Sequence, residues 1–234
     1  MRPITAALSL LLALSFAVSP LLVPDFGGFD PNQFPVPQND PPVQPKGYAF
    51  GIWGVIYLWL ILGLGYGFLT RREDADWHAM RQPLCVSLAV GTIWLAVAVQ
   101  SPIWASVLIW VMLGTALLAL FRAPRHDVWT ASFPVGLYAG WLSAASCVSL
   151  GLLAAGYGWM SQGTAATVFI LLAIVIAATV QSALRRAPSY GIAVIWALVA
   201  VVVQNLATSP GIAALAAGGA VALLLPSWRA ARQS

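Results

Sequence analysis

Eight long apolar segments limit what this chain of 234 residues can fold into. A helix of roughly 20 apolar residues spans the hydrocarbon core of a membrane, and each segment is close to that length without an internal charge. The pattern predicts an all-α, polytopic transmembrane helix bundle of about eight spans. The segments cover residues 4–23, 48–70, 84–101, 102–121, 129–154, 164–184, 190–207 and 210–226.

The overall composition agrees with a membrane protein. Hydrophobic residues make up 60% of the chain and charged residues 8%, and the mean hydropathy is +0.86. These values exclude a disordered chain, and the small, scattered basic excess excludes a nucleic-acid partner. The lipid bilayer is therefore the expected surrounding.

The arginines predict the orientation of the spans. They fall in alternate connections, and arginine-rich connections stay on the cytoplasmic side of a membrane. We therefore expect an integral protein of a bacterial inner membrane with both termini in the cytoplasm. The outer side carries only Lys46, with Asp25, Asp30 and Asp40. The arginines of the inner side are Arg2, Arg71, Arg72, Arg81, Arg122, Arg125, Arg185, Arg186, Arg229 and Arg232.

Residues 1–24 allow two interpretations. Arg2 followed by an apolar run, with the small residues Ala17 and Ser19, is typical of a secretory signal. Pro20 directly after Ser19 disfavours cleavage there, and the run is long for a signal, so we expect an N-terminal anchor helix. Cleavage would leave seven spans with the same orientation.

The predicted spans lack the residues that most catalytic and ion-coupled sites use. Each Lys, Arg, Asp and Glu lies between the spans or at their edges, although membrane proteins keep such charges where function needs them. His78 and His126 lie in predicted loops without a second donor cluster, so no metal site is expected. Nucleophile, phosphate-loop and zinc-protease motifs are absent from the sequence. The sequence thus predicts a protein that is not an enzyme.

Aromatic side chains form two stripes at helical spacing. Phe50, Trp53 and Tyr57 are three and four residues apart and share one face of the second predicted span. Tyr138 and Trp141 have the same spacing in the fifth span. Two facing stripes could enclose a flat ligand, or they could simply form packed bundle core.

The eleven tryptophans divide by position. Those close to the ends of spans are expected to anchor the chain at the membrane interface. Trp94 and several others lie deeper, where they face lipid or the bundle. The expected anchors are Trp77, Trp104, Trp129, Trp159 and Trp228.

Two pairs of glycines predict close helix contacts. Gly63 with Gly67, and Gly136 with Gly140, are four residues apart in the second and fifth spans. Small residues at this spacing let neighbouring helices approach closely in a membrane.

The outer segment at residues 25–47 is too rich in proline to be a helix. Seven prolines occur between Pro24 and Pro45, and proline favours extended backbone. We expect a semi-rigid loop over the outer end of the bundle. It would act either as a plain spacer or as a lid over a cavity that opens outward.

Short motifs around these aromatic stripes share a pattern with one known family. Pro45 leads into a helix with Phe50, Trp53 and, four residues later, Tyr57. The chain thereby resembles the tryptophan-rich sensory protein or translocator protein family (TspO/MBR, peripheral benzodiazepine receptor type), although Phe50 is one residue nearer the tryptophan than in the usual form. Two further likenesses are the turn Ser101, Pro102, Ile103 and Trp104 and the run Tyr138, Ala139, Gly140 and Trp141 with Ala145.

Some positions depart from the family's pattern. The likeness covers about residues 41–184 and indicates a divergent subfamily. The departures are Gln100 for a tryptophan, Trp104 and Ala105 for paired phenylalanines, Leu137 for a proline and Ser149 for an asparagine.

The resemblance implies a five-helix core at residues 48–185, with residues 186–234 adding two C-terminal transmembrane helices and a short basic tail. It also implies a pocket at one end of that core, covered by the loop after the first core helix, for porphyrins, sterols or other flat hydrophobic molecules. Here that loop is residues 71–82, which the arginines place inside. Which loop covers a pocket therefore stays open.

The leading hypothesis is a non-enzymatic receptor or carrier for a tetrapyrrole or sterol-like ligand, without a resident cofactor. One alternative is a structural subunit that assembles with another membrane protein or with a second copy of this chain. Another is a facilitative permease for a neutral solute. In the leading hypothesis the ligand stacks on Phe50, Trp53, Tyr57, Trp94, Tyr138 and Trp141.

Reporter fusions test the predicted orientation. We expect green fluorescent protein fused after Arg125 to fluoresce, because it folds in the cytoplasm, and alkaline phosphatase fused after Asp40 to be active outside. Phosphatase activity in a fusion after Arg125 would contradict the arrangement.

Overall fold

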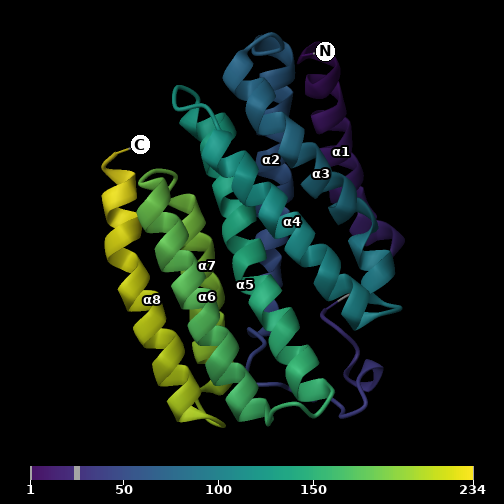
Figure 1. Cartoon of the computed structure of the whole chain (residues 1–234), viewed down its shortest axis with the longest axis vertical. Coiled ribbons are helices and arrows are strands. Elements are labelled where there is room, and N and C mark those ends of the chain that lie inside the picture. The colour runs from purple at the N-terminus through teal and green to yellow at the C-terminus, as the bar shows by residue number, and fades with distance from the viewer. Residues whose placement is uncertain (1, 24–26, 234) are drawn as a thin grey trace.

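The computed structural model describes residues 2–23 and 27–233, so Asp25 of the predicted outer side lies outside the described residues. The described residues form α-helices packed side by side in one bundle, with no strand among them (Figure 1). The predicted all-α membrane bundle is confirmed. The helices are α1 Arg2–Leu22, α2 Ile52–Thr70, α3 Ala75–Ala98, α4 Pro102–Arg122, α5 Phe133–Gly156, α6 Gln162–Leu184, α7 Ser189–Asn205 and α8 Pro210–Ala231.

Seven of these helices are long and apolar enough to cross a membrane. The remaining one, α7, has 17 residues and is about 25 Å long, slightly less than the hydrocarbon thickness. It packs against α5 and α8. The two tightest predicted turns also occur, since Ser101 caps α4 through its side chain and Pro210 begins α8.

The start of α3 differs from the prediction. The helix begins at Ala75, nine residues before the predicted span, because the Asp74 carboxylate accepts hydrogen bonds from the backbone amides of Asp76 and Trp77. Residues 75–83 therefore form helix where a loop was expected. Arg81 lies in this added part of α3, outside the predicted span. It is fully buried, stacks over the Trp77 ring at 4.9 Å, and donates a hydrogen bond to the Arg71 carbonyl at 3.0 Å.

Helix α5 lies at the centre of the bundle. It packs against α2, α4, α6 and α7, while α1 covers α2 and α3, and α8 covers α6 and α7. Most residues of α5 are buried, on every side of the helix. A helix that is apolar all round is expected in such a position. Its side chains therefore make up much of the interior of the bundle.

The predicted glycine contacts are present. A Cβ on Gly140 would lie 2.9 Å from the Cβ of Ala193 and closer still to the backbone of Tyr190, so α5 and α7 touch there. Gly63 lies against the backbone of Thr130, in the π-helix η3 (Val128–Ser132), and Gly67 lies against the ring of Trp77. Such contacts are possible because glycine has no side chain.

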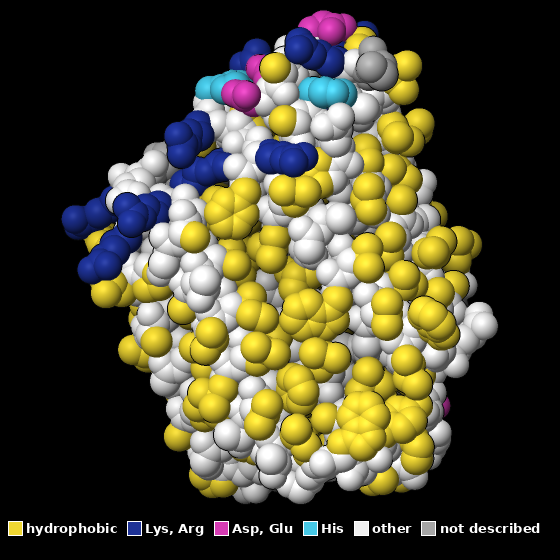
Figure 2. Space-filling view, in the orientation of Figure 1, with side chains coloured by type: hydrophobic (Ala, Val, Ile, Leu, Met, Phe, Trp, Pro, Cys, Tyr) yellow, Lys and Arg dark blue, Asp and Glu magenta, His cyan; other side chains and the backbone are white. Residues whose placement is uncertain are grey.

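The outer surface of the bundle is an apolar belt with arginines at one end. Hydrophobic side chains are spread over the face in Figure 2, and Lys and Arg side chains gather at its upper end. The exposed hydrophobic residues are mainly leucine, valine and isoleucine. Trp104, Trp129, Trp159 and Trp228 are exposed, as interfacial anchors require. Trp77 is fully buried, so its prediction as an anchor was wrong.

Replacing Gly140 by alanine tests the close approach of α5 and α7. The added methyl group would push against the Tyr190 backbone, and overpacking of this kind costs about 1–3 kcal/mol. We expect a lower melting temperature in detergent. Gly114→Ala in α4 is the matched control, because a Cβ there meets nothing within 4 Å, and an equal loss in both variants would contradict the prediction.

Candidate functional site

The two aromatic stripes meet at a cavity of about 530 Å³ between α1, α2, α3, α4 and α5. Its volume lies in the range of pockets that hold small organic molecules. Its other walls are apolar, including Ile109 and Met112 of α4. Of the predicted ligand-binding residues, the structure brings Phe50, Trp53, Tyr57, Trp94 and Trp141 into the lining.

The rings of the cavity hold one another at fixed angles. Trp53 and Tyr57 are stacked with 5.3 Å between centroids, because they are four residues apart on α2. Trp141 meets Trp53 edge-on at 6.3 Å and Phe50 edge-on at 5.8 Å. Edge-on contacts leave part of each ring face turned to other partners. The lining is therefore aromatic and already assembled.

Tyr138, the remaining predicted residue, lies behind the lining. It is fully buried, and its hydroxyl is 2.8 Å from the Ser87 hydroxyl, which itself donates to the Met112 carbonyl. The Tyr138 hydroxyl therefore donates to Ser87. Its ring packs against the Trp53 ring, with 6.3 Å between the two ring centroids. The structure thus gives Tyr138 a supporting position and not a place in the wall.

The sequence interpretation missed Phe16 of α1. Its ring lies edge-on to Trp53 at 5.6 Å and to Tyr57 at 5.1 Å and lines the cavity. Gly91 of α3 makes room for it, since a Cβ there would lie 2.8 Å from the Phe16 ring. The signal that could have found it is the row of small residues at helical spacing on the same face of α1. That buried row is Ala6, Ser9, Ala13, Phe16 and Ser19.

Two further pockets lie between the cavity and the end of the bundle opposite the arginines, which is the outer end in the predicted orientation. A narrow space of about 60 Å³ shares Phe50, Trp94 and Trp141 with the cavity. That space in turn shares Phe29 and Gln44 with an outer pocket of about 720 Å³. A line of adjoining pockets therefore leads from the outer end of the bundle to the aromatic rings.

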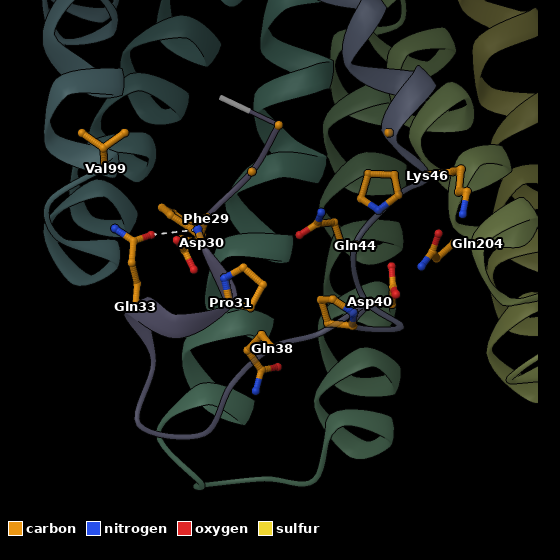
Figure 3. A pocket seen from close by; sticks show the side chains of 15 residues that line it. Phe29, Asp30, Pro31, Gln33, Gln38, Asp40, Gln44, Lys46, Val99 and Gln204 are labelled. Carbon is orange, nitrogen blue, oxygen red and sulfur yellow. Dashed lines mark hydrogen bonds between the residues drawn. The ribbon is translucent and has the colours of Figure 1, made fainter. Parts of the chain in front are cut away.

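The outer pocket is polar. Figure 3 shows Asp30, Gln33, Gln38, Gln44 and Lys46 of the proline-rich segment around it, with Gln204 of α7 on the far side. Gln38 is 3% exposed, and its side-chain oxygen has no hydrogen-bond partner among the described residues.

Deeper in, the indole N–H of Trp141, a residue 2% exposed, also lacks a partner among the described residues. Leaving a buried polar group unpaired costs about 1–3 kcal/mol. A buried acceptor (Gln38) and a buried donor (Trp141) therefore belong to residues that line these pockets.

The proline-rich segment covers the outer ends of three helices. The backbone amide of Val36 donates to the Gly156 carbonyl of α5 at 2.8 Å, and that of Lys46 donates to the Ala200 carbonyl of α7 at 3.2 Å. Gln33 reaches the Ala98 carbonyl of α3 at 3.0 Å through its side chain. The segment is therefore attached across the bundle end and borders each of the adjoining pockets.

The loop that the resemblance implies as a cover lies elsewhere. Residues 71–74 form the α2–α3 connection and residues 75–82 belong to α3, at the arginine-bearing end. That end is opposite the proline-rich segment in Figure 1. Residues 71–82 therefore do not cover the aromatic cavity.

A family model described as TSPO-like protein matches residues 36–228. The chain belongs to the TSPO-like family. The match confirms the resemblance read from the aromatic motifs, and in this TSPO-like protein it runs from the proline-rich segment through α8. None of the curated proteins and none of the solved structures matches the chain.

At its arginine-bearing end the TSPO-like protein has a cluster around Asp127. The Asp127 carboxylate accepts a hydrogen bond from Arg71 Nε at 2.8 Å and from the Trp77 indole N–H at 2.8 Å. His126 Nε2 lies 3.3 Å from Asp74 and 3.4 Å from Asp127. These contacts join the α2–α3 and α4–α5 connections. Among the described residues, no group of three or more His, Cys, Asp or Glu side chains could hold a metal ion.

The cluster shifts two pKa values. Burial raises the pKa of Asp127, but hydrogen bonds from Arg71 and Trp77 and the Arg71 charge outweigh burial, so the pKa lies below its usual range. The same hydrogen bond and charge raise the pKa of Arg71. Ionised Asp127 therefore stabilises the folded state.

Asp127→Asn tests this cluster. The variant loses the ionised acceptor, and we expect a cost of about 1–2 kcal/mol at pH 7, reduced by the partial exposure of Arg71. A carboxylate with a depressed folded pKa stabilises above its unfolded pKa of about 3.9, and this contribution is lost as pH falls through the folded pKa. The melting-temperature difference from wild type should therefore shrink below about pH 4. Glu73→Gln, which removes an exposed neighbouring carboxylate, should change little, and a difference independent of pH would contradict the assignment.

Proposed function

We propose that this TSPO-like membrane protein is a non-enzymatic receptor or carrier that binds a flat hydrophobic ligand in the aromatic cavity. A tetrapyrrole is the first candidate, and a sterol-like molecule is the second. The proposal is carried by one observation, the convergence of Phe50, Trp53, Tyr57, Trp94 and Trp141 from separate elements on one cavity. Aromatic faces favour flat rings through stacking and burial.

The chemistry of the lining supports binding over catalysis. Tyr57 is the only titratable residue among the described residues that line the aromatic cavity. General acid–base chemistry needs a positioned donor and acceptor with pKa values near the working pH. The proposed ligand would therefore bind and dissociate without being chemically altered.

The unpaired polar atoms support a preferred orientation of the ligand. The Trp141 indole N–H can donate to an acceptor at the edge of a flat ring, and Gln38 can accept from a group nearer the opening. The ligand would enter beneath the proline-rich segment. With the arginine-bearing end in the cytoplasm, this opening faces outward.

Titration of protoporphyrin IX into the detergent-solubilised protein tests the proposal. Tryptophan quenching and the shift of the porphyrin absorption band together give a Kd. We expect Trp53→Leu with Trp141→Leu to weaken binding by about tenfold or more, because each lost ring contact is worth about 0.5–1.5 kcal/mol beyond its buried area.

A second double variant is the matched control. Trp159→Leu with Trp228→Leu removes the same number of indoles from exposed positions outside the cavity. Its affinity should stay within about twofold of wild type. Equal affinity in wild type and in the Trp53, Trp141 variant would overturn the proposal.

A further inference from the structure

A second recess lies at the arginine-bearing end, away from the aromatic cavity. It has a volume of about 480 Å³ and lies beside the C-terminus of α4. Its polar lining comes from Arg122, Arg125, His126 and Arg186, with Asp76 as the one carboxylate among its described residues. Nothing in the proposed receptor role uses this recess.

The positive charges of the recess are only partly neutralised. Arg122 and Arg125 are exposed and form no ion pair among the described residues. His126 Nε2 lies next to Asp74 and Asp127, and neither of these carboxylates forms an ion pair with Arg122 or Arg125. Three guanidinium groups therefore face a single acid, Asp76.

Arg186 is a fixed part of the wall. It is 9% exposed, and its guanidinium donates to the Ala123 and Leu120 carbonyls at 3.0 Å each and to the Ser132 hydroxyl at 3.1 Å. These bonds satisfy carbonyls at the end of α4, as a basic residue at a helix C-terminus does. Burial, and then the charge of Arg125, lower the pKa of Arg186. An anion in the recess would relieve this repulsion.

The recess lies at the level where the chain leaves the apolar layer. Phe121, 45% exposed, lines the recess one residue before the end of α4. Exposed aromatic residues of this kind mark the membrane interface. An apolar surface therefore adjoins the arginines, as a molecule with a charged head and acyl chains requires.

We propose that this recess binds the phosphate group of an anionic phospholipid. Arg122 and Arg125 contact the phosphate oxygens, Arg186 forms the fixed positive wall, and the acyl chains lie along Phe121 and the neighbouring apolar surface. Arginine suits this role because its planar guanidinium can donate two parallel hydrogen bonds to a phosphate. Basic pockets between transmembrane helices bind lipid head groups in this way.

Native mass spectrometry of the full chain tests the proposal, with thermal stability as a second measurement. The probes are phosphatidylglycerol, phosphatidylcholine and inorganic phosphate at equal phosphate concentration. We expect phosphatidylglycerol alone to bind measurably and to raise the melting temperature. Arg122→Gln with Arg125→Gln should weaken its binding by about tenfold, and Asp76→Asn should strengthen it by about two- to threefold.

The control variant is Arg229→Gln with Arg232→Gln. It removes the same charge from the same end of the bundle but from α8, outside the recess. Its affinity for phosphatidylglycerol should stay within about twofold of wild type. Because Arg122 and Arg125 form no ion pair within the described chain, and Arg125 repels Arg186, their variant should not lower the melting temperature without lipid.

Three results would overturn the proposal. An equal loss in the two double variants would show attraction to the whole charged surface. Equal binding of inorganic phosphate would show a site for a soluble anion. Equal binding of phosphatidylcholine would show that the charge of the lipid does not matter.

Discussion

The structure depends on close packing of the helices around α5. The lipid hydrocarbon that surrounds a membrane bundle offers no hydrogen-bond partner to backbone polar groups. Within lipid, helices gain little from hydrophobic burial and associate through van der Waals contact and hydrogen bonds. α5 supplies both, through Gly136 and Gly140 against α7 and through serines that bond its neighbours. Ser143 meets the Tyr190 hydroxyl of α7, and Ser149 meets the Ser106 hydroxyl of α4. Trp141 of the same helix lines the aromatic cavity.

Much of this arrangement was predictable from the sequence. The spans follow from apolar length, and the meeting of Trp53 with Trp141 follows from helical spacing on two faces that both avoid charge. The start of α3 was not predictable from hydropathy, because Asp74 and a stacked Trp77–Arg81 pair extend the helix through charged residues. The spacing of small residues on α1 marks the face that carries Phe16, but spacing alone gives neither the ring contacts of Phe16 nor the position of Tyr138 behind the lining. Their positions depend on Ser87 and on Gly91, which belong to another helix.

The two ends of the bundle differ in chemistry. At the outer end, glutamine amides, Lys46 and the proline-rich segment surround a polar opening above the aromatic rings. At the other end, Arg71, Trp77 and Asp127 join two connections, and further Lys and Arg side chains gather at the surface. Among the described residues, the buried charged side chains are Arg81 and Arg186, and both lie toward this end.

Phe16 gives the first helix a part in the site that its position in the sequence does not suggest. α1 packs mainly against α2 and α3, and its phenylalanine closes the side of the cavity between them. Without Phe16, Trp53 and Tyr57 would lose these edge-on contacts and would be open to the acyl chains on that side. Retention or removal of α1 would therefore decide whether the chamber is sealed from the bilayer or reached by molecules already dissolved in it.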